Sequence, residues 1–245
     1  MTYLLLFMAG AIAWMISTVA AGGAAMLLIP ILGLTLSAQS VAPVITVASL
    51  MANPSRTFVF WQYIYWPVIA LLLPGSIIGA ILGAYAFTLM PAHYLQLILG
   101  LFLLSTIWQY RFGKRQRSFP MPRWAFFPLG MSVAFVSGLV GGAGPVMNPF
   151  FLNHGMEKEQ LVATKAFNSL AMQGTKLVSY LGLGAISWQM GVSGVAIGLG
   201  GILGVFWARH HLQRIDNERF RQYTLYLMPI GGLLLIAKAA SSLST

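Results

Sequence analysis

Residues 67–89 read PVIALLLPGSIIGAILGAYAFTL, a run without one charged side chain. A helix needs about 20 apolar residues to cross the ~30 Å hydrocarbon core of a bilayer. The rest of the chain has the same character, because hydrophobic residues make up 58% and charged residues only 7% of its 245 positions. Such a balance cannot keep the surface of a soluble domain wet. The sequence therefore predicts an all-α integral membrane protein without a separate soluble domain.

Apolar elements follow one another along the whole chain with short connections. They cover residues 3–20, 24–36, 41–63, 67–89, 92–109, 124–141, 145–153, 160–183, 189–208 and 222–240. Elements 24–36 and 145–153 are too short to span comfortably, and each follows a glycine break and contains a proline. Irregular backbone survives at membrane depth only where protein or a water-lined cavity satisfies its polar groups. These two elements are expected to be glycine-broken half-helices or re-entrant hairpins.

The formal net charge of +10 comes from fourteen Lys and Arg residues set against four acidic ones. Most of the basic residues lie in two loops, around 111–123 and 209–221. Cytoplasmic loops of membrane proteins accumulate Lys and Arg, so this charge predicts orientation and does not point to nucleic acid. We expect both loops in the cytoplasm, both termini in the periplasm, and a multi-pass protein of the cell inner membrane.

The same features recur at a spacing of about 120 residues. Gly22-Gly23 and Pro30 match Gly141-Gly142 and Pro149, Ser49-Leu50 matches Ser169-Leu170, Arg56 matches Lys176, and Gly79 and Gly83 match Gly200 and Gly204. We therefore expect two transmembrane repeats, 1–110 and 124–245, joined by the basic loop 111–123 within one membrane domain. Five elements per copy would insert the second copy upside down, as in the inverted-topology repeats of secondary transporters.

The glycine breaks are the first candidates for a substrate site. Gly22, Gly23, Gly141, Gly142 and Gly144 would let backbone N–H groups approach an anion, with the N-terminal dipole of the following half-helix adding positive potential. The alternative is that glycines permit close helix packing, as small residues do throughout membrane bundles. We prefer packing for the glycines within regular helices, among them Gly79, Gly83, Gly200 and Gly204, and prefer the site for the two proline-associated breaks.

Polar side chains inside apolar elements are the second group of candidates. Lys165 is a candidate ligand, and Arg56 and Lys176 are candidate charge partners, although each of the three could instead snorkel to an interface. Asn53, Asn148 and Asn168 could bind an oxyanion or join helices, and Gln173 is a weaker companion.

No Asp or Glu lies at membrane depth, which disfavours a carboxylate site for cations. The four histidines sit at expected interfaces without metal-ligand spacing, cysteine is missing from the sequence, and no nucleophile motif has a plausible context. We therefore expect no catalytic residues, no metal and no cofactor, and no enzyme activity.

The duplicated breaks resemble a known family. Ala21-Gly22-Gly23-Ala24 with Pro30, and GLVGGAGP (138–145) with Pro149, are followed by ATKAFNS (163–169). This order resembles the TauE/SafE sulfite exporter family over essentially the whole chain. The resemblance implies transport of sulfite or organosulfur anions such as sulfoacetate, with a site at Gly22, Gly23, Asn53, Gly141, Gly142, Gly144, Lys165 and Asn168. The first break reads Gly-Gly-Ala-Ala where the family often has a longer glycine run.

Taken together, these features predict a secondary transporter that moves a small anion by alternating access, one repeat rocking against the other. The expected partners are that anion and the lipid bilayer, and a homo-oligomer is left open. The rival interpretations are a channel-like facilitator of small neutral solutes and a non-transporting membrane subunit.

Overall fold

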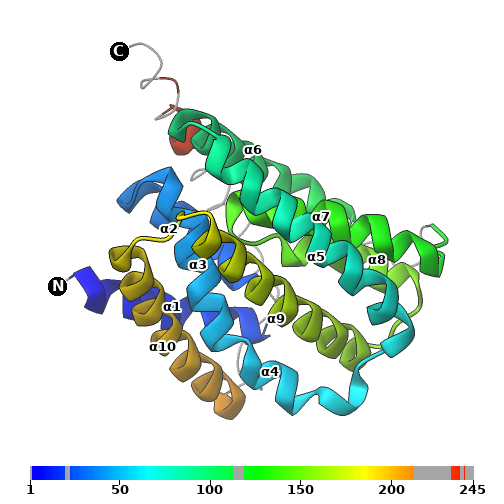
Figure 1. The fold of residues 1–245 in the computed structure, drawn as a ribbon. Coiled ribbons are helices and arrows are strands. Elements are labelled where there is room, and N and C mark those ends of the chain that lie inside the picture. The colour runs from blue at the N-terminus through cyan, green and yellow to red at the C-terminus, as the bar shows by residue number, and fades with distance from the viewer. Residues whose placement is uncertain (1, 20–22, 113–118, 212–232, 238–239, 241–245) are drawn as a thin grey trace.

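The computed structural model describes all residues except 1, 20–22, 113–118, 212–232, 238–239 and 241–245. Every regular element in the described part is a helix (Figure 1). The α-helices are α1 Thr2–Val19, α2 Ala24–Thr35, α3 Ala38–Ala52, α4 Pro54–Val59, α5 Trp66–Leu89, α6 Ala92–Phe112, α7 Phe126–Val140, α8 Asn148–Asn153, α9 Lys158–Gly182 and α10 Trp188–His211. Short 3₁₀ turns are η1 Trp61–Tyr63, η2 Arg123–Ala125 and η3 Gly144–Met147. The predicted all-helical class is confirmed.

The helices form two groups, each built from both halves of the sequence. In one group α1 packs along α10, and α10 packs on α3. In the other α5 packs along both α7 and α9. Figure 1 shows α1 and α10 on one side and α5, α6 and α7 on the other, with α3 and α9 between them. The two groups meet where α3 contacts α9.

Glycines bring the paired helices together until their backbones touch. On α5, a Cβ at Gly79 would lie 2.0 Å from the carbonyl oxygen of Met131 on α7, and at Gly75 and Gly83 it would lie 2.2 and 2.4 Å from other α7 carbonyl oxygens. On α10, a Cβ at Gly200 would lie 2.0 Å from the Phe7 carbonyl oxygen of α1. Small residues have this role in membrane bundles because they allow close backbone approach. The packing interpretation of these glycines is confirmed.

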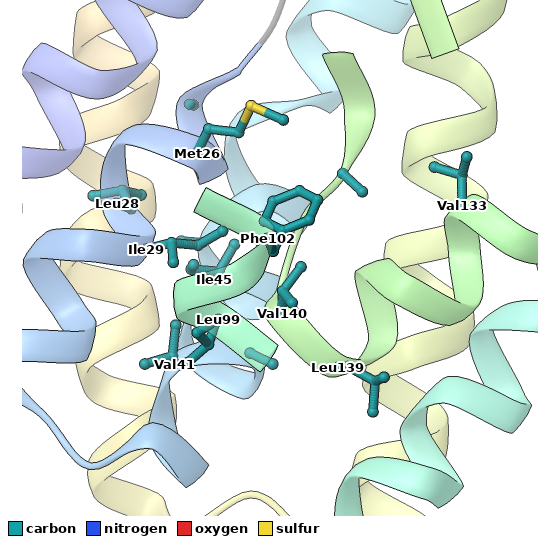
Figure 2. Close-up of a cluster of buried hydrophobic side chains, with 14 of the residues drawn as sticks. Met26, Leu28, Ile29, Val41, Ile45, Leu99, Phe102, Val133, Leu139 and Val140 are labelled. Atoms are coloured by element: carbon teal, nitrogen blue, oxygen red, sulfur yellow. The ribbon is translucent and has the colours of Figure 1, made fainter. Parts of the chain in front are cut away.

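An apolar core fills the space between α2, α3, α6 and α7. Figure 2 shows Met26 and Ile29 of α2 next to Ile45 of α3, with Phe102 of α6 and Val140 of α7 closing the cluster. All five side chains are buried. This core packs two segments against α3. One is the start of α2, which follows the first glycine break, and the other is the end of α7, which precedes the second.

Among the described residues, three helices are long and apolar enough to cross a membrane: Trp66–Leu89, Arg123–Val140 and Trp188–Ala208. Shorter apolar helices cover Tyr3–Ser17, Ala24–Thr35, Ala38–Ala52 and Ala92–Ser105. The structure thus supports a multi-pass membrane protein, while re-entrant hairpins at 24–36 and 145–153 stay a prediction. The inverted repeat and the boundaries 1–110, 111–123 and 124–245 also stay predictions.

One expected element is divided in the structure. Residues 41–63 were expected to form a single apolar element, but α3 ends at Ala52 and α4 begins at Pro54. Proline has no N–H for the helical ladder, and its ring clashes with the preceding turn, so the first turn of a helix is its preferred place. Asn53 therefore lies at a helix break. The last expected element, 222–240, falls mostly outside the described residues.

Candidate functional site

Helix α9 carries a polar stripe through the middle of the molecule. Lys165, Asn168, Ser169, Gln173 and Lys176 recur at intervals of one to four residues and fall on one side of a helix with 3.6 residues per turn. A capping box fixes the start of this helix, since the Glu157 side chain accepts from the backbone at Gln160 and the Gln160 side chain accepts from the backbone N–H of Glu157. Hydrogen bonds of the stripe run to the end of α3, to α7 with its cap, and to α8.

Lys176 lies at one end of the stripe and is fully buried. Its Nζ donates to the Ser137 Oγ at 3.2 Å and to the Gly141 carbonyl oxygen at 2.9 Å. Both partners are uncharged, so within the described part of the chain the ammonium has no carboxylate partner. Gly141 caps the C-terminus of α7 with a φ of 98°, so the ammonium sits at the negative end of that helix dipole. The snorkelling interpretation of Lys176 is wrong, because tertiary packing encloses the side chain.

Lys165 lies near the other end of the stripe, roughly 16 Å along the helix axis from Lys176 at 1.5 Å per residue. The half-buried Lys165 Nζ donates to the Asn148 Oδ1 at 2.7 Å. Asn148 begins the short helix α8. The segment from Gly141 to Asn148 therefore contacts α9 at both ends, through one lysine at each.

Asn53, at the break between α3 and α4, connects the two helix groups. The Trp14 Nε1 of α1 donates to the Asn53 Oδ1 at 3.3 Å, and the Asn53 Nδ2 donates to the Ser169 Oγ of α9 at 3.3 Å. The proline after Asn53 ends α3 at this level and so places the amide beside the stripe.

Two amides of the stripe are buried without hydrogen-bond partners for their oxygens. Asn168 is 1% exposed and Gln173 is 3% exposed. The Asn168 Oδ1 and the Gln173 Oε1 have no hydrogen-bond partner among the residues that the structure describes. Leaving a buried acceptor unpaired is costly, so each such group needs an explanation, and a bound ligand is one.

The glycines of the two breaks differ in their surroundings, because some are packed against other elements and one faces open space. A Cβ at Gly142 would lie 2.3 Å from the Ala25 Cβ of α2, so this glycine lets the two broken segments meet. A Cβ at Gly144 would meet nothing within 4 Å. Gly23 caps the start of α2 with a φ of 116°, a conformation that favours glycine. Gly22 lies outside the described residues.

The second broken element differs from the half-helix predicted over 145–153. It consists of the turn η3 followed by α8, which has only six residues. So short a helix lines up few peptide dipoles, which removes most of the dipole potential expected there. In the first half α2 has twelve residues and retains this potential.

The structure therefore brings Asn53, Asn148, Gly141, Lys165 and Lys176 to one face of α9. Arg56 belongs to α4, and its side chain lies outside the described part. Three residues that hold the predicted amide and lysine in place were not predicted as site residues: Trp14, Ser137 and Ser169. Ser169 could have been predicted because it lies next to Asn168 in the repeated segment. Nothing in the sequence around Trp14 or Ser137 indicates a role in the site.

Comparison with known proteins gives a consistent result. The family described as Sulfite exporter TauE/SafE matches residues 6–235. A "Probable membrane transporter protein YtnM" from Bacillus subtilis (strain 168) is 26% identical over 185 residues, 70% of this chain and 58% of that protein. The match thus spans less than two thirds of the length of this relative. No solved structure gives a significant match. The chain belongs to the sulfite exporter TauE/SafE family of membrane transporters.

Proposed function

We propose that this protein is a secondary transporter that moves small anions, sulfite or organosulfur anions such as sulfoacetate, across the inner membrane. The observation that carries the proposal is the fully buried Lys176, whose two hydrogen-bond partners are uncharged. An ammonium has three N–H donors, so one remains for a ligand. An anion would supply both the missing acceptor and the missing counter-charge.

The energetics of burial favour this interpretation over a purely structural lysine. Taking an ammonium out of water costs several kcal/mol even after relaxation, and neutral hydrogen bonds offset this only in part. A methionine would fill the same volume at no such cost. A buried lysine without a carboxylate therefore points to a function of its charge, and intramembrane ionisable residues are typically functional.

The remaining site residues would line the path of the anion along the stripe, at distances from Lys176 that one small anion cannot bridge at once. Lys165 and Asn148 form one end, Asn53 and Asn168 lie between, and Gly141 and Lys176 form the other end. Gly144 has open space beside it and can leave backbone groups accessible. The two glycine breaks also contain Gly22, Gly23 and Gly142. Gly142 contributes chiefly by leaving room for the Ala25 side chain.

For alternating access, we propose that the moving bodies are the two helix groups, not the two halves of the sequence. Close glycine contacts join α1 to α10 and α5 to α7, so these pairs move as units. The contact between α3 and α9 then lies between the bodies, where the Asn53–Ser169 hydrogen bond crosses it. The proposed site thus lies between the two bodies, where their movement would expose it first to one side of the membrane and then to the other.

The pattern of helix pairs supports a duplicated fold, and the odd number of elements per copy makes an inverted topology the arrangement we propose. If the second repeat mirrors the first, α1 corresponds to α7 and α5 to α10. The pair α1–α10 then corresponds to α7–α5, and the pair α3–α10 to α9–α5, and all four pairs are observed. With the basic loop 111–123 in the cytoplasm, both termini would be periplasmic.

Uptake of radiolabelled sulfite into proteoliposomes tests the proposal, with sulfate, sulfoacetate and a neutral solute as competitors under imposed pH and voltage gradients. We expect saturable uptake that unlabelled sulfite inhibits and the neutral solute does not, while sulfate and sulfoacetate measure how selective the site is among sulfur anions. Equal passage of the neutral solute would indicate a facilitator. Folded protein without anion flux would refute the proposal and favour a non-transporting subunit.

A further inference from the structure

An eight-residue segment occurs twice in this chain, 120 positions apart. Residues 49–56 read SLMANPSR and residues 169–176 read SLAMQGTK. Both begin with Ser-Leu, continue with Met and Ala in either order, and then have an amide, a helix-breaking residue, a hydroxyl residue and a cation. The first segment spans the break between α3 and α4, and the second covers the C-terminal part of the α9 stripe.

The two segments touch each other, which places them in one site. The amide of the first, Asn53, donates to the first residue of the second, Ser169. Asn53 also accepts from Trp14, so its oxygen is satisfied. The corresponding amide of the second segment, Gln173, is 3% exposed, and its Oε1 has no hydrogen-bond partner among the described residues.

Gln173 and Lys176 are neighbours on α9. Residues three apart on a helix lie on the same face, with about 5–6 Å between their Cβ atoms. Lys176 has one N–H donor left after its bonds to Ser137 and Gly141, whereas Gln173 has a free acceptor. A ligand that satisfies both must accept a hydrogen bond from the lysine and donate one to the glutamine. Asn168, with its free buried Oδ1, offers a second acceptor along the same stripe.

From this arrangement we infer that Gln173 determines specificity, and that the cargo is a monoanion carrying its own O–H or N–H donor. The inference rests on the proposed function and narrows its substrate class. One ammonium balances one negative charge, and the unpaired amide oxygen requires a donor from the ligand. Hydrogen sulfite fits this description. Sulfate and the sulfoacetate dianion do not, because they lack a donor and bring a second charge.

The physical reason for selectivity is the unpaired acceptor. A ligand without a donor would leave the Gln173 oxygen buried and unsatisfied, a penalty that corresponds to roughly a ten- to hundredfold loss of affinity. Sites built to hydrogen-bond a hydroxyl reject analogues that lack one for the same reason.

Two matched pairs of competitors test the inference in proteoliposomes that take up radiolabelled sulfite. The first pair is 2-hydroxyethanesulfonate and propane-1-sulfonate, monoanions in which a hydroxyl replaces a methyl group. The second pair is hydrogencarbonate and nitrate, planar monoanions of which only the first carries an O–H. We expect the donor-bearing member to inhibit uptake at least about tenfold more strongly in one pair or both. No difference in either pair would overturn the inference while leaving anion transport standing.

Variants separate Gln173 from other buried amides. Q173L removes the acceptor at similar volume, and we expect it to abolish the preference for donor-bearing competitors. The control is Q96L, because Gln96 also has a buried, unpartnered Oε1 but lies on α6. We expect Q96L to keep the preference. A folded Q173L protein with unchanged preference would overturn the inference, and if Q173L does not fold, the wild-type competitor pairs still decide it. Folded wild-type protein without any sulfite uptake would instead refute the proposed function itself.

Discussion

Replacing Gly79 by alanine tests whether α5 and α7 form one rigid unit. The added Cβ would lie 2.0 Å from the Met131 carbonyl oxygen, whereas ordinary van der Waals contact begins at 3.4 Å. The two backbones must therefore separate by up to 3.4 − 2.0 = 1.4 Å along this direction. Gaps of 0.5–1 Å already forfeit about a quarter to a half of the dispersion energy of the facing atoms. With the cost of overpacking, we expect a loss of about 1–3 kcal/mol of stability.

The control for G79A is G174A. Gly174 lies in α9, and a Cβ there would meet nothing within 4 Å. Alanine in a helix interior is more stable than glycine by about 0.5–1 kcal/mol, so the control is expected to be neutral or stabilising.

Thermal unfolding in detergent, followed by size-exclusion chromatography, measures both variants. A loss of 1–3 kcal/mol corresponds to a fall of roughly 2–12 °C in the apparent Tm of a chain of this length. We expect such a fall for G79A and an unchanged or raised Tm for G174A. Equal Tm values for G79A and wild type would refute the close backbone contact and the rigid pair derived from it.

Three further substitutions probe α9 and its contact with Asn53. E157A removes the capping box and is expected to cost about 0.5–2 kcal/mol, seen as a lower Tm with wild-type sulfite affinity; a wild-type Tm would show that the cap contributes little. N53A and S169A each break the hydrogen bond between the helix groups, so their effects on uptake should be non-additive in the double variant. Strict additivity would show that the bond does not couple the groups.

The helices could be predicted from the sequence because the length of each apolar stretch largely sets which residues form a helix. The stretch 67–89 became α5, and the short elements after Gly23 and Gly144 became α2 and the η3–α8 segment. The division of 41–63 was missed because its composition is apolar throughout, and Pro54 alone marks the break. The packing role of Gly79 was predictable, since helix-spaced small residues serve that purpose in membranes.

The site was harder to predict because its contacts join residues far apart in the chain. The spacing of Lys176 from the polar loops gave no way to choose between snorkelling and burial, and the choice depends on α7 ending at Gly141 beside it. The role of Trp14 depends on α1 packing near the α3–α4 break. The Lys165–Asn148 pair joins two residues that were each predicted separately.

Sulfite flux through the K176M variant tests the account most directly. Methionine retains the length and removes the charge, so stability should be unchanged or raised, while flux should fall by roughly tenfold or more with the loss of a charge-assisted bond. The control is Y180F, which removes another buried hydrogen bond between α9 and α7, from the Tyr180 hydroxyl to the Gly138 carbonyl oxygen, without changing charge. We predict that folded K176M loses flux and Y180F keeps it. Wild-type flux in K176M, or an equal loss in both variants, would contradict the claim that the buried ammonium binds the transported anion.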